Sequence, residues 1–152
     1  MIAVRSLTKD HAIPGLRAGY LATTEALAGR IEAARPPWTT SAPAQAAIIA
    51  ATHEETFVAE SRARLLANRV RLTSRLDALG FATIPSTTVY TLVRVGDARA
   101  LREQLLARHR ILVRDCASFG LPDFIRVCAR ALPDEDRLVA ALTEARAFER
   151  RE

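Results

Sequence analysis

The stretch Ser6-Leu7-Thr8-Lys9 contains the only lysine of a 152-residue chain, and Arg17 follows that lysine by eight residues in Pro14-Gly15-Leu16-Arg17-Ala18-Gly19-Tyr20. All the other residues among the 22 lysines and arginines are arginine. Arginine can replace lysine as a charge, but it stays protonated and cannot act as a nucleophilic amine. The single lysine therefore indicates that the protein uses its amine as a nucleophile. The alternative, a surface lysine kept by chance, is weakened by the neighbouring hydroxyls and by Arg17.

Length and composition are typical of one globular domain, or of one domain with part of a second. The chain is 49% hydrophobic, which is enough to build a core. No apolar run approaches the roughly 20 residues that span a bilayer, so no membrane partner is expected. The first five residues are too short for a signal peptide and carry no cleavage pattern, so a cytoplasmic location is expected.

The net charge of +5 makes an acidic partner such as nucleic acid worth considering. Five arginines, however, fall on one predicted amphipathic helix, where a solvated face is the ordinary interpretation: Arg62, Arg64, Arg69, Arg71 and Arg75. Aromatic residues make up 5% of the chain and do not alternate with basic ones, as they do in single-strand binders. Nucleic acid is therefore not the expected partner.

The cysteines and histidines do not indicate a metal site. Cys116 and Cys128 lie twelve residues apart, which fits neither a CxxC pair nor a disulfide framework. The three histidines are scattered along the chain and show no zinc-ligand spacing. No metal is expected.

Residues 55–152 show the clearest secondary-structure pattern. A long amphipathic helix is expected over 55–79, with Gly80 as its C-terminal cap. Strands and helices then alternate, with strands at 89–95, 111–114 and 124–130, a loop at 115–123, and helices at 97–109 and 133–150. This order predicts a compact α+β unit with helices on one face of a small sheet.

Residues 1–54 do not form a convincing domain by themselves. Short strands are expected at 1–5 and 16–22, on either side of a loop at 6–14. Helices are expected over 25–34 and 42–53, and the second is apolar enough to be buried. Two strands without neighbours are not independently stable. The predicted organisation is an incomplete unit at 1–54 and a C-terminal unit with a long connecting helix at 55–152.

The segment from Ser6 to Tyr20 resembles the cofactor-lysine segment of fold-type I pyridoxal-phosphate enzymes, the class I/II aminotransferases and their decarboxylase relatives. Ile111-Leu112-Val113-Arg114-Asp115-Cys116, followed by Phe124-Ile125-Arg126-Val127, resembles the histidinol-phosphate aminotransferase and threonine-phosphate decarboxylase group. The resemblance covers essentially the whole chain. It implies an α/β fold with an α+β C-terminal part, in which 1–54 is a remnant of the large cofactor-binding domain's sheet.

The resemblance also implies a role for each residue of the first segment. Lys9 would bind the aldehyde of pyridoxal 5′-phosphate covalently. Ser6 and Arg17 would hold the cofactor phosphate, with Thr8 as a further candidate, since hydroxyl and guanidinium groups form strong hydrogen bonds with phosphate oxygens. The alternative is that these residues are a turn hydroxyl and a surface arginine.

Arg126 is singled out by its place on a predicted strand. Alternation puts it on the face opposite Ile125 and Val127, beside small and aromatic neighbours, where a guanidinium can grip a planar anion. The resemblance makes that anion the substrate α-carboxylate. It likewise assigns Arg114 to a phosphate on the substrate side chain, although Asp115 could neutralise Arg114 locally.

The function implied by the resemblance is amino-group transfer on a phosphorylated amino acid or amine such as histidinol phosphate. The alternative within the group is decarboxylation, as in a threonine-phosphate decarboxylase-like enzyme of cobalamin biosynthesis. An alternative of another class is a non-catalytic basic α+β module that binds an acidic partner with strong salt dependence. Because the family pattern begins before Met1, the chain is expected to be a fragment with little activity alone, and the full-length protein a homodimer.

Overall fold

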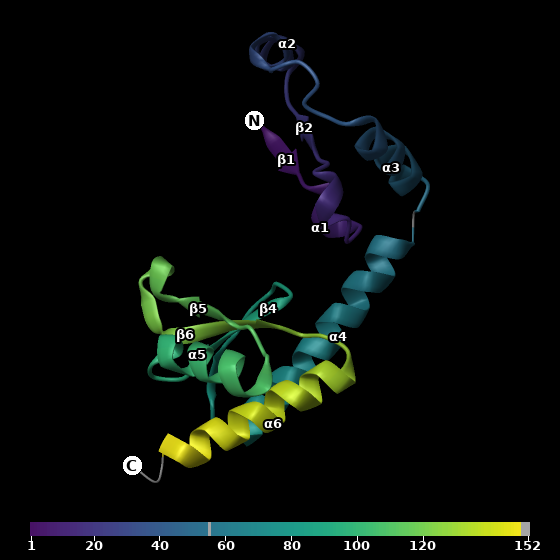
Figure 1. Ribbon diagram of the computed structural model, residues 1–152. Helices are drawn as coiled ribbons and strands as arrows, with labels where there is room; N and C mark the ends of the chain where they lie inside the picture. Colours follow the sequence, from purple (N-terminus) through teal and green to yellow (C-terminus); the bar gives the residue numbers. More distant parts are fainter. Residues whose placement is uncertain (55, 150–152) are drawn as a thin grey trace. The chain divides into compact units, whose positions relative to one another are not determined.

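The computed structural model describes residues 1–54 and 56–149. The chain divides into two compact units, Met1–Ser61 and Arg62–Glu152, each with its own internal packing (Figure 1). The sequence placed the boundary between residues 54 and 55, and the assignment of the first part to a large domain stays a prediction. Residue 55 and the expected helix end at Arg150 lie outside the described residues.

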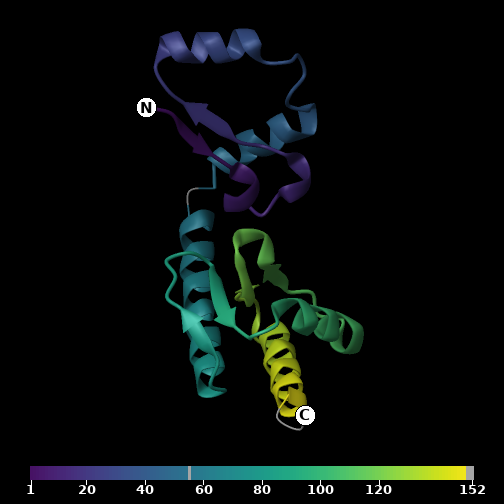
Figure 2. The same ribbon diagram turned by 90° about the vertical axis from the view of Figure 1, so that its left-hand side faces the viewer.

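The first unit is built around a two-stranded antiparallel ribbon. Strand β1 (Ala3–Arg5) pairs with β2 (Tyr20–Ala22), and Figure 2 shows the two strands side by side. Between them lie a helical turn, α1 (Leu7–Asp10), and a 3-10 turn, η1 (Pro14–Leu16). The expected loop at 6–14 was therefore wrong in part. A single turn of helix is too short to leave a periodic pattern in the sequence.

Two helices follow the ribbon, α2 (Glu25–Ala34) and α3 (Ala42–Thr52), close to the expected limits. The Ser41 hydroxyl caps α3 by accepting the Ala44 N–H at 3.3 Å. The expectation that α3 is buried was wrong: Ala44 is its only buried residue, and Ile49 is 62% exposed. An apolar composition leads to burial only where a facing surface exists, and the described elements of the first unit leave most of α3 uncovered.

The second unit is a four-stranded antiparallel sheet packed on helices, with the strand order β3-β4-β6-β5. The strands are β3 (Ala82–Ile84), β4 (Tyr90–Arg94), β5 (Arg114–Cys116) and β6 (Leu121–Cys128). The helices are α4 (Phe57–Ala78), which begins in the first unit, α5 (Ala98–His109) and α6 (Leu132–Glu149). A 3-10 turn, η2 (Ala117–Phe119), connects β5 to β6.

The core joins the three helices to one face of this sheet (Figure 1). Val93 on β4 and Ile125 on β6 are fully buried, because alternate side chains of a strand point to the same face. They pack with leucines of the helices: Leu72, Leu76, Leu101, Leu105, Leu138 and Leu142. The predicted α+β unit, with its helices on one face of a small sheet, is confirmed. The other face of the sheet carries Leu92 and Arg126.

The sheet differs from the sequence expectation in three places. Strand β3 was not expected, because three residues are too few to show alternation. Strand β5 lies at Arg114–Cys116 rather than at 111–114, and β6 begins at Leu121, inside the expected loop at 115–123. The strands join through a tight connection in which Gly120 has a φ of 75°. The pairing across this hairpin, rather than apolar composition, sets the strand limits.

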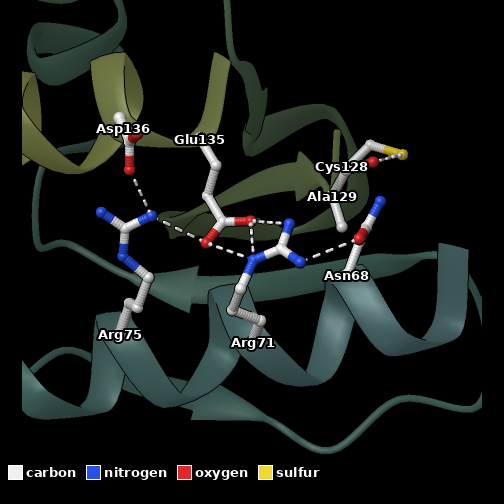
Figure 3. Close-up of polar contacts among 7 residues, drawn as sticks. All are labelled: Asn68, Arg71, Arg75, Cys128, Ala129, Glu135 and Asp136. Atoms are coloured by element: carbon white, nitrogen blue, oxygen red, sulfur yellow. Dashed lines mark hydrogen bonds and ion pairs between the residues drawn. The ribbon is translucent and has the colours of Figure 1, made fainter. Parts of the chain in front are cut away.

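A buried carboxylate ties α6 to α4 (Figure 3). The Glu135 side chain is fully buried and accepts hydrogen bonds from Arg71 and Arg75, each at 2.9 Å. Arg71 also donates to Asn68 at 3.0 Å, and Arg75 contacts Asp136 at 2.8 Å. The hydrogen bond to Glu135 raises the pKa of Arg75 above its ordinary value. This network fixes the start of α6, which directly follows β6, against α4.

Candidate active site

The α1 turn brings Ser6, Thr8 and Lys9 together. Ser6 Oγ lies 2.7 Å from Thr8 Oγ1, and Lys9 Nζ donates to Ser6 Oγ at 3.4 Å. Thr8 is buried, whereas Lys9 is exposed. Two hydroxyl groups that bond to each other therefore lie next to an accessible amine. The binding roles of these residues stay predictions.

The segment that carries Arg17 packs beside this turn. The Thr8 N–H donates to the Ala18 carbonyl at 3.2 Å. Arg17 itself is exposed and has a left-handed backbone, with φ 51° and ψ 58°, and its guanidinium donates to the Pro14 carbonyl at 3.4 Å. At Gly19 an added Cβ would lie 2.6 Å from the Arg5 carbonyl oxygen, so the close approach of the two backbones requires glycine.

In the second unit, Arg114 and Arg126 are direct cross-strand partners on β5 and β6. Residues opposite each other share one face of the sheet, with Cβ atoms about 4.5–5.5 Å apart, and like charges in these positions repel. Among the described residues, no carboxylate lies within 4.0 Å of either guanidinium. Asp115, considered as a local partner of Arg114, pairs with Arg102 instead, at 3.8 Å. A bound anion would relieve the repulsion between the two arginines.

The contacts of the two guanidinium groups orient them without neutralising their charge. Arg114 donates to the Ser118 hydroxyl at 2.9 Å and lies over the Phe119 ring. The Arg126 guanidinium lies over the ring of Tyr90, 4.5 Å from the ring centroid. A cation above a ring face is attracted by its quadrupole, so Tyr90 orients Arg126 and leaves its charge unpaired.

A cavity of about 470 Å³ borders both arginines. Three arginines that the sequence had not marked as site residues also line it: Arg110, Arg130 and Arg137. Asp134 and Glu135 border the cavity as well, but Asp134 pairs with Arg130 at 2.8 Å and Glu135 with the arginines of α4. The cavity is therefore cationic overall and suited to an anionic ligand.

These additional arginines are distant from one another in the sequence. Alternation along the expected strand at 124–130 puts Arg130 on the face of Arg126, and this could have placed it near the site. Arg110 follows α5 and Arg137 lies on α6, and only the tertiary fold brings them to the same cavity. The α1 turn with Lys9 belongs to the first unit, and the cationic cavity belongs to the second.

The part of the chain that the structure describes holds neither a metal-ligand cluster nor a membrane-spanning helix. Within residues 1–54 and 56–149, no three cysteine, histidine or acidic side chains gather where they could hold a metal ion. None of the described helices combines the length and the apolar character needed to cross a membrane.

Comparison with known proteins identifies the family. The family described as aminotransferase class I and II matches residues 1–144. Histidinol-phosphate aminotransferase 1 of Thiobacillus denitrificans is 34% identical over 144 residues, which are 95% of this chain and 37% of the relative.

Two solved structures show the same fold. Histidinol-phosphate aminotransferase from Sinorhizobium meliloti, in complex with pyridoxal-5′-phosphate, matches with a TM-score of 0.85 and 29% identity over 94% of this chain and 40% of that one. L-threonine-O-3-phosphate decarboxylase from Porphyromonas gingivalis matches with a TM-score of 0.84 and 27% identity over 93% of this chain and 45% of that one.

The fold is thus that of a part of a pyridoxal-phosphate-dependent transferase, and the resemblance found in the sequence is confirmed. The chain belongs to the class I and II aminotransferase family. It spans 37% of the length of the curated relative from Thiobacillus denitrificans.

Proposed function

We propose that this chain is the cofactor-lysine and substrate-binding part of an enzyme that transfers the amino group of a phosphorylated amino acid or amine, such as histidinol phosphate. The proposal depends on the Ser6–Thr8–Lys9 network beside Arg17. An accessible amine, two hydroxyls and a guanidinium match an aldehyde that carries a phosphate group. This donor set fits pyridoxal 5′-phosphate, which supplies an electron sink when bound.

In this proposal Lys9 Nζ would hold the cofactor covalently at rest and, once the substrate amine has displaced it, the free Lys9 amine would move the proton at the substrate Cα. The hydrogen bond that Lys9 Nζ donates to Ser6 is long, at 3.4 Å, so the amine is free to leave it. Ser6 and Arg17 would hold the cofactor phosphate, with Thr8 as a further candidate. Since Thr8 is buried and bonded to Ser6, it contributes mainly by orienting the Ser6 hydroxyl.

In this proposal Arg126 binds the carboxylate of a phosphorylated amino acid, and Arg114 binds the substrate phosphate, which is the only anionic group of histidinol phosphate. Two adjacent guanidinium groups that lack a carboxylate partner among the described residues support both assignments. The same arginines would serve decarboxylation. The likeness to the decarboxylase from Porphyromonas gingivalis supports this alternative. Product analysis of the full-length protein with O-phosphothreonine separates carbon dioxide release from amino transfer.

We also propose that this chain alone turns over little or no substrate, because it spans 37% of the curated relative's length. Turnover by the 152-residue chain at the rate of a full-length relative would contradict this proposal. Homodimer formation by the full-length protein and a cytoplasmic location stay predictions.

The test of the Lys9 assignment is borohydride reduction in the presence of pyridoxal phosphate, followed by peptide mass spectrometry. The expected result is a reduced adduct on Lys9, lost in Lys9→Ala and in Lys9→Arg, which keeps the charge but lacks the reactive amine. Arg17→Gln should weaken cofactor binding by about tenfold or more, since hydrogen bonds to charged groups contribute about 1.5–3 kcal/mol. An adduct only at the amino terminus, or one that persists in Lys9→Arg, would overturn the assignment.

A further inference from the structure

His11 directly follows the α1 turn that contains Lys9, and it has no part in the proposed cofactor contacts. Its ring stacks on the ring of Phe57, with the ring centroids 5.8 Å apart and an interplanar angle of 11°. Both residues belong to the first unit. Aromatic rings favour an offset stacked arrangement with centroids about 4.5–7 Å apart. The stack therefore joins the α1 turn to Phe57, the first residue of α4.

Backbone hydrogen bonds hold His11 on the turn that carries Lys9. The His11 N–H donates to the Leu7 carbonyl at 3.0 Å. On the other side of Lys9, the Thr8 N–H donates to the Ala18 carbonyl at 3.2 Å. Lys9 thus lies between two points at which the turn is attached to the rest of the first unit, one at Thr8 and one at His11.

The α1 helix has only four residues and cannot by itself hold Lys9 in one orientation. A first helical turn fixes several backbone dihedrals for one hydrogen bond, so short helices depend on tertiary contacts. Lys9 is exposed, and the hydrogen bond that its amine donates to Ser6 Oγ is long, at 3.4 Å. The direction of the amine is therefore set mainly by the contacts of the neighbouring residues.

The stack of His11 and Phe57 lies outside the hydrophobic core. Phe57 is 38% exposed and His11 is half-buried, and the core cluster contains neither residue. Because the free energy of burial is roughly proportional to the apolar area removed from water, this contact contributes little to the stability of the fold. Loss of the stack should therefore change the behaviour of the Lys9 segment more than the unfolding temperature.

We propose that His11 is a positioning residue for the Lys9 amine and that it acts by stacking on Phe57. This inference rests on the proposed role of Lys9 in holding the cofactor. Phe57 begins α4, the helix that continues into the second unit, where Arg126 lies on β6. The stack thus attaches the turn with the reactive amine to the helix that leads to the proposed substrate-binding arginines.

The single lysine of the chain allows a direct measurement. A chain made with isotopically labelled lysine carries the label only at Lys9, so NMR relaxation reports the mobility of this side chain without cofactor. His11→Ala is expected to increase this mobility. It should also slow formation of the borohydride-trapped pyridoxal phosphate adduct on Lys9 by about two- to tenfold, the factor that corresponds to the loss of an aromatic pair. His11→Phe keeps a ring and should restore both values.

Phe57→Ala tests whether the ring contact is the cause. It should reproduce the effects of His11→Ala, and the double variant should add nothing to either single variant, because residues that act through one contact are not additive. His53→Ala is the matched control, since His53 also ends a helix of the first unit but is exposed and is not part of this stack. It should leave the Lys9 mobility and the adduct rate unchanged.

Several results would overturn the inference. These are additive effects of His11→Ala and Phe57→Ala, a His11→Phe variant that behaves like His11→Ala, or an equal effect of His53→Ala. A wild-type chain that forms no adduct at Lys9 would instead overturn the proposed role of Lys9, whereas the mobility measurement would still test the stack. Thermal unfolding of each variant verifies that the measurements are made on folded protein.

Discussion

Gly19 allows two backbone segments of the first unit to approach more closely than any other residue would. In Gly19→Ala the new Cβ would meet the Arg5 carbonyl oxygen at 2.6 Å. We expect this variant to destabilise the ribbon by about 1–3 kcal/mol, as forced overpacking does, and to weaken pyridoxal phosphate binding. Hydrogen exchange of β1 and β2 and a cofactor titration measure the two effects.

Gly29→Ala is the control for this substitution. A Cβ at Gly29 would have no neighbour within 4 Å, and the residue lies inside α2. Alanine there should be neutral or stabilising by up to about 1 kcal/mol, because glycine is a poor helix former. Equal effects of the two substitutions would contradict the close-approach explanation.

The two cysteines should differ in reactivity. Desolvation, complete at Cys116 and partial at Cys128, is the largest influence on both thiols and raises the pKa of each above the ordinary value. Cys116 is 1% exposed, whereas Cys128 is exposed and borders the cationic cavity. We expect iodoacetamide to label Cys128 first, with a rate that rises over a pH range above that of free cysteine, because the thiolate is the reacting form.

Mass spectrometry of the labelled chain as a function of pH measures this difference. Labelling of Cys116 should require unfolding, and urea should bring both sites to the rate of a model peptide. The raised pKa also means that the folded state keeps its thiol protons at pH values where the unfolded chain loses them. The stability contributed by the buried thiol of Cys116 is therefore present at neutral pH and lost as the pH rises through the folded-state pKa.

Among the elements, α6 is attached to α4 by the buried Glu135 carboxylate in addition to the apolar core. Glu135→Ala would leave Arg71 and Arg75 without their shared buried partner. Breaking a fully buried pair costs roughly 3–5 kcal/mol, and we expect about 2–3 kcal/mol here because both arginines are about a third exposed. Urea unfolding measures the loss.

The neighbouring carboxylate provides the matched control. Asp136 contacts the same Arg75 at 2.8 Å, but its side chain is 56% exposed. Asp136→Ala should change the free energy of unfolding by less than about 1 kcal/mol, as for other surface ion pairs. If the two substitutions cost the same, burial of Glu135 is not the reason for its contribution.

At the scale of the whole molecule, the two units should differ in stability. The hydrophobic core cluster lies entirely in the second unit. In the first unit, Ala18 and Ala44 are the only buried apolar residues among those described. Because local stability follows the density of buried apolar contacts, we expect amides of β4, β6 and α5 to exchange far more slowly than those of β1 and β2. Hydrogen-exchange mass spectrometry tests this, and equal protection of the units would contradict it.

The chemistry of single residues and the local structure could be predicted from short-range patterns in the sequence. The lone Lys9, with Ser6, Thr8 and Arg17 at their spacing, was enough to mark the family. The helix expected at 97–109 is α5, and it begins where the Asp97 carboxylate accepts the N–H groups of Arg99 and Ala100. Helix periodicity and helix caps involve residues only a few positions apart, so both can be recognised in the sequence.

Contacts between residues far apart in the sequence could not be predicted and follow from the packed fold. Arg114 could lie opposite Arg126, and Leu92 beside it, only once the hairpin register was fixed. The contact of Tyr90 with Arg126 and the burial of Glu135 between two arginines likewise left no local pattern. The physical reason is that a shift of one residue in strand pairing would move every side chain of the strand to the other face, and that choice depends on the packed core as a whole.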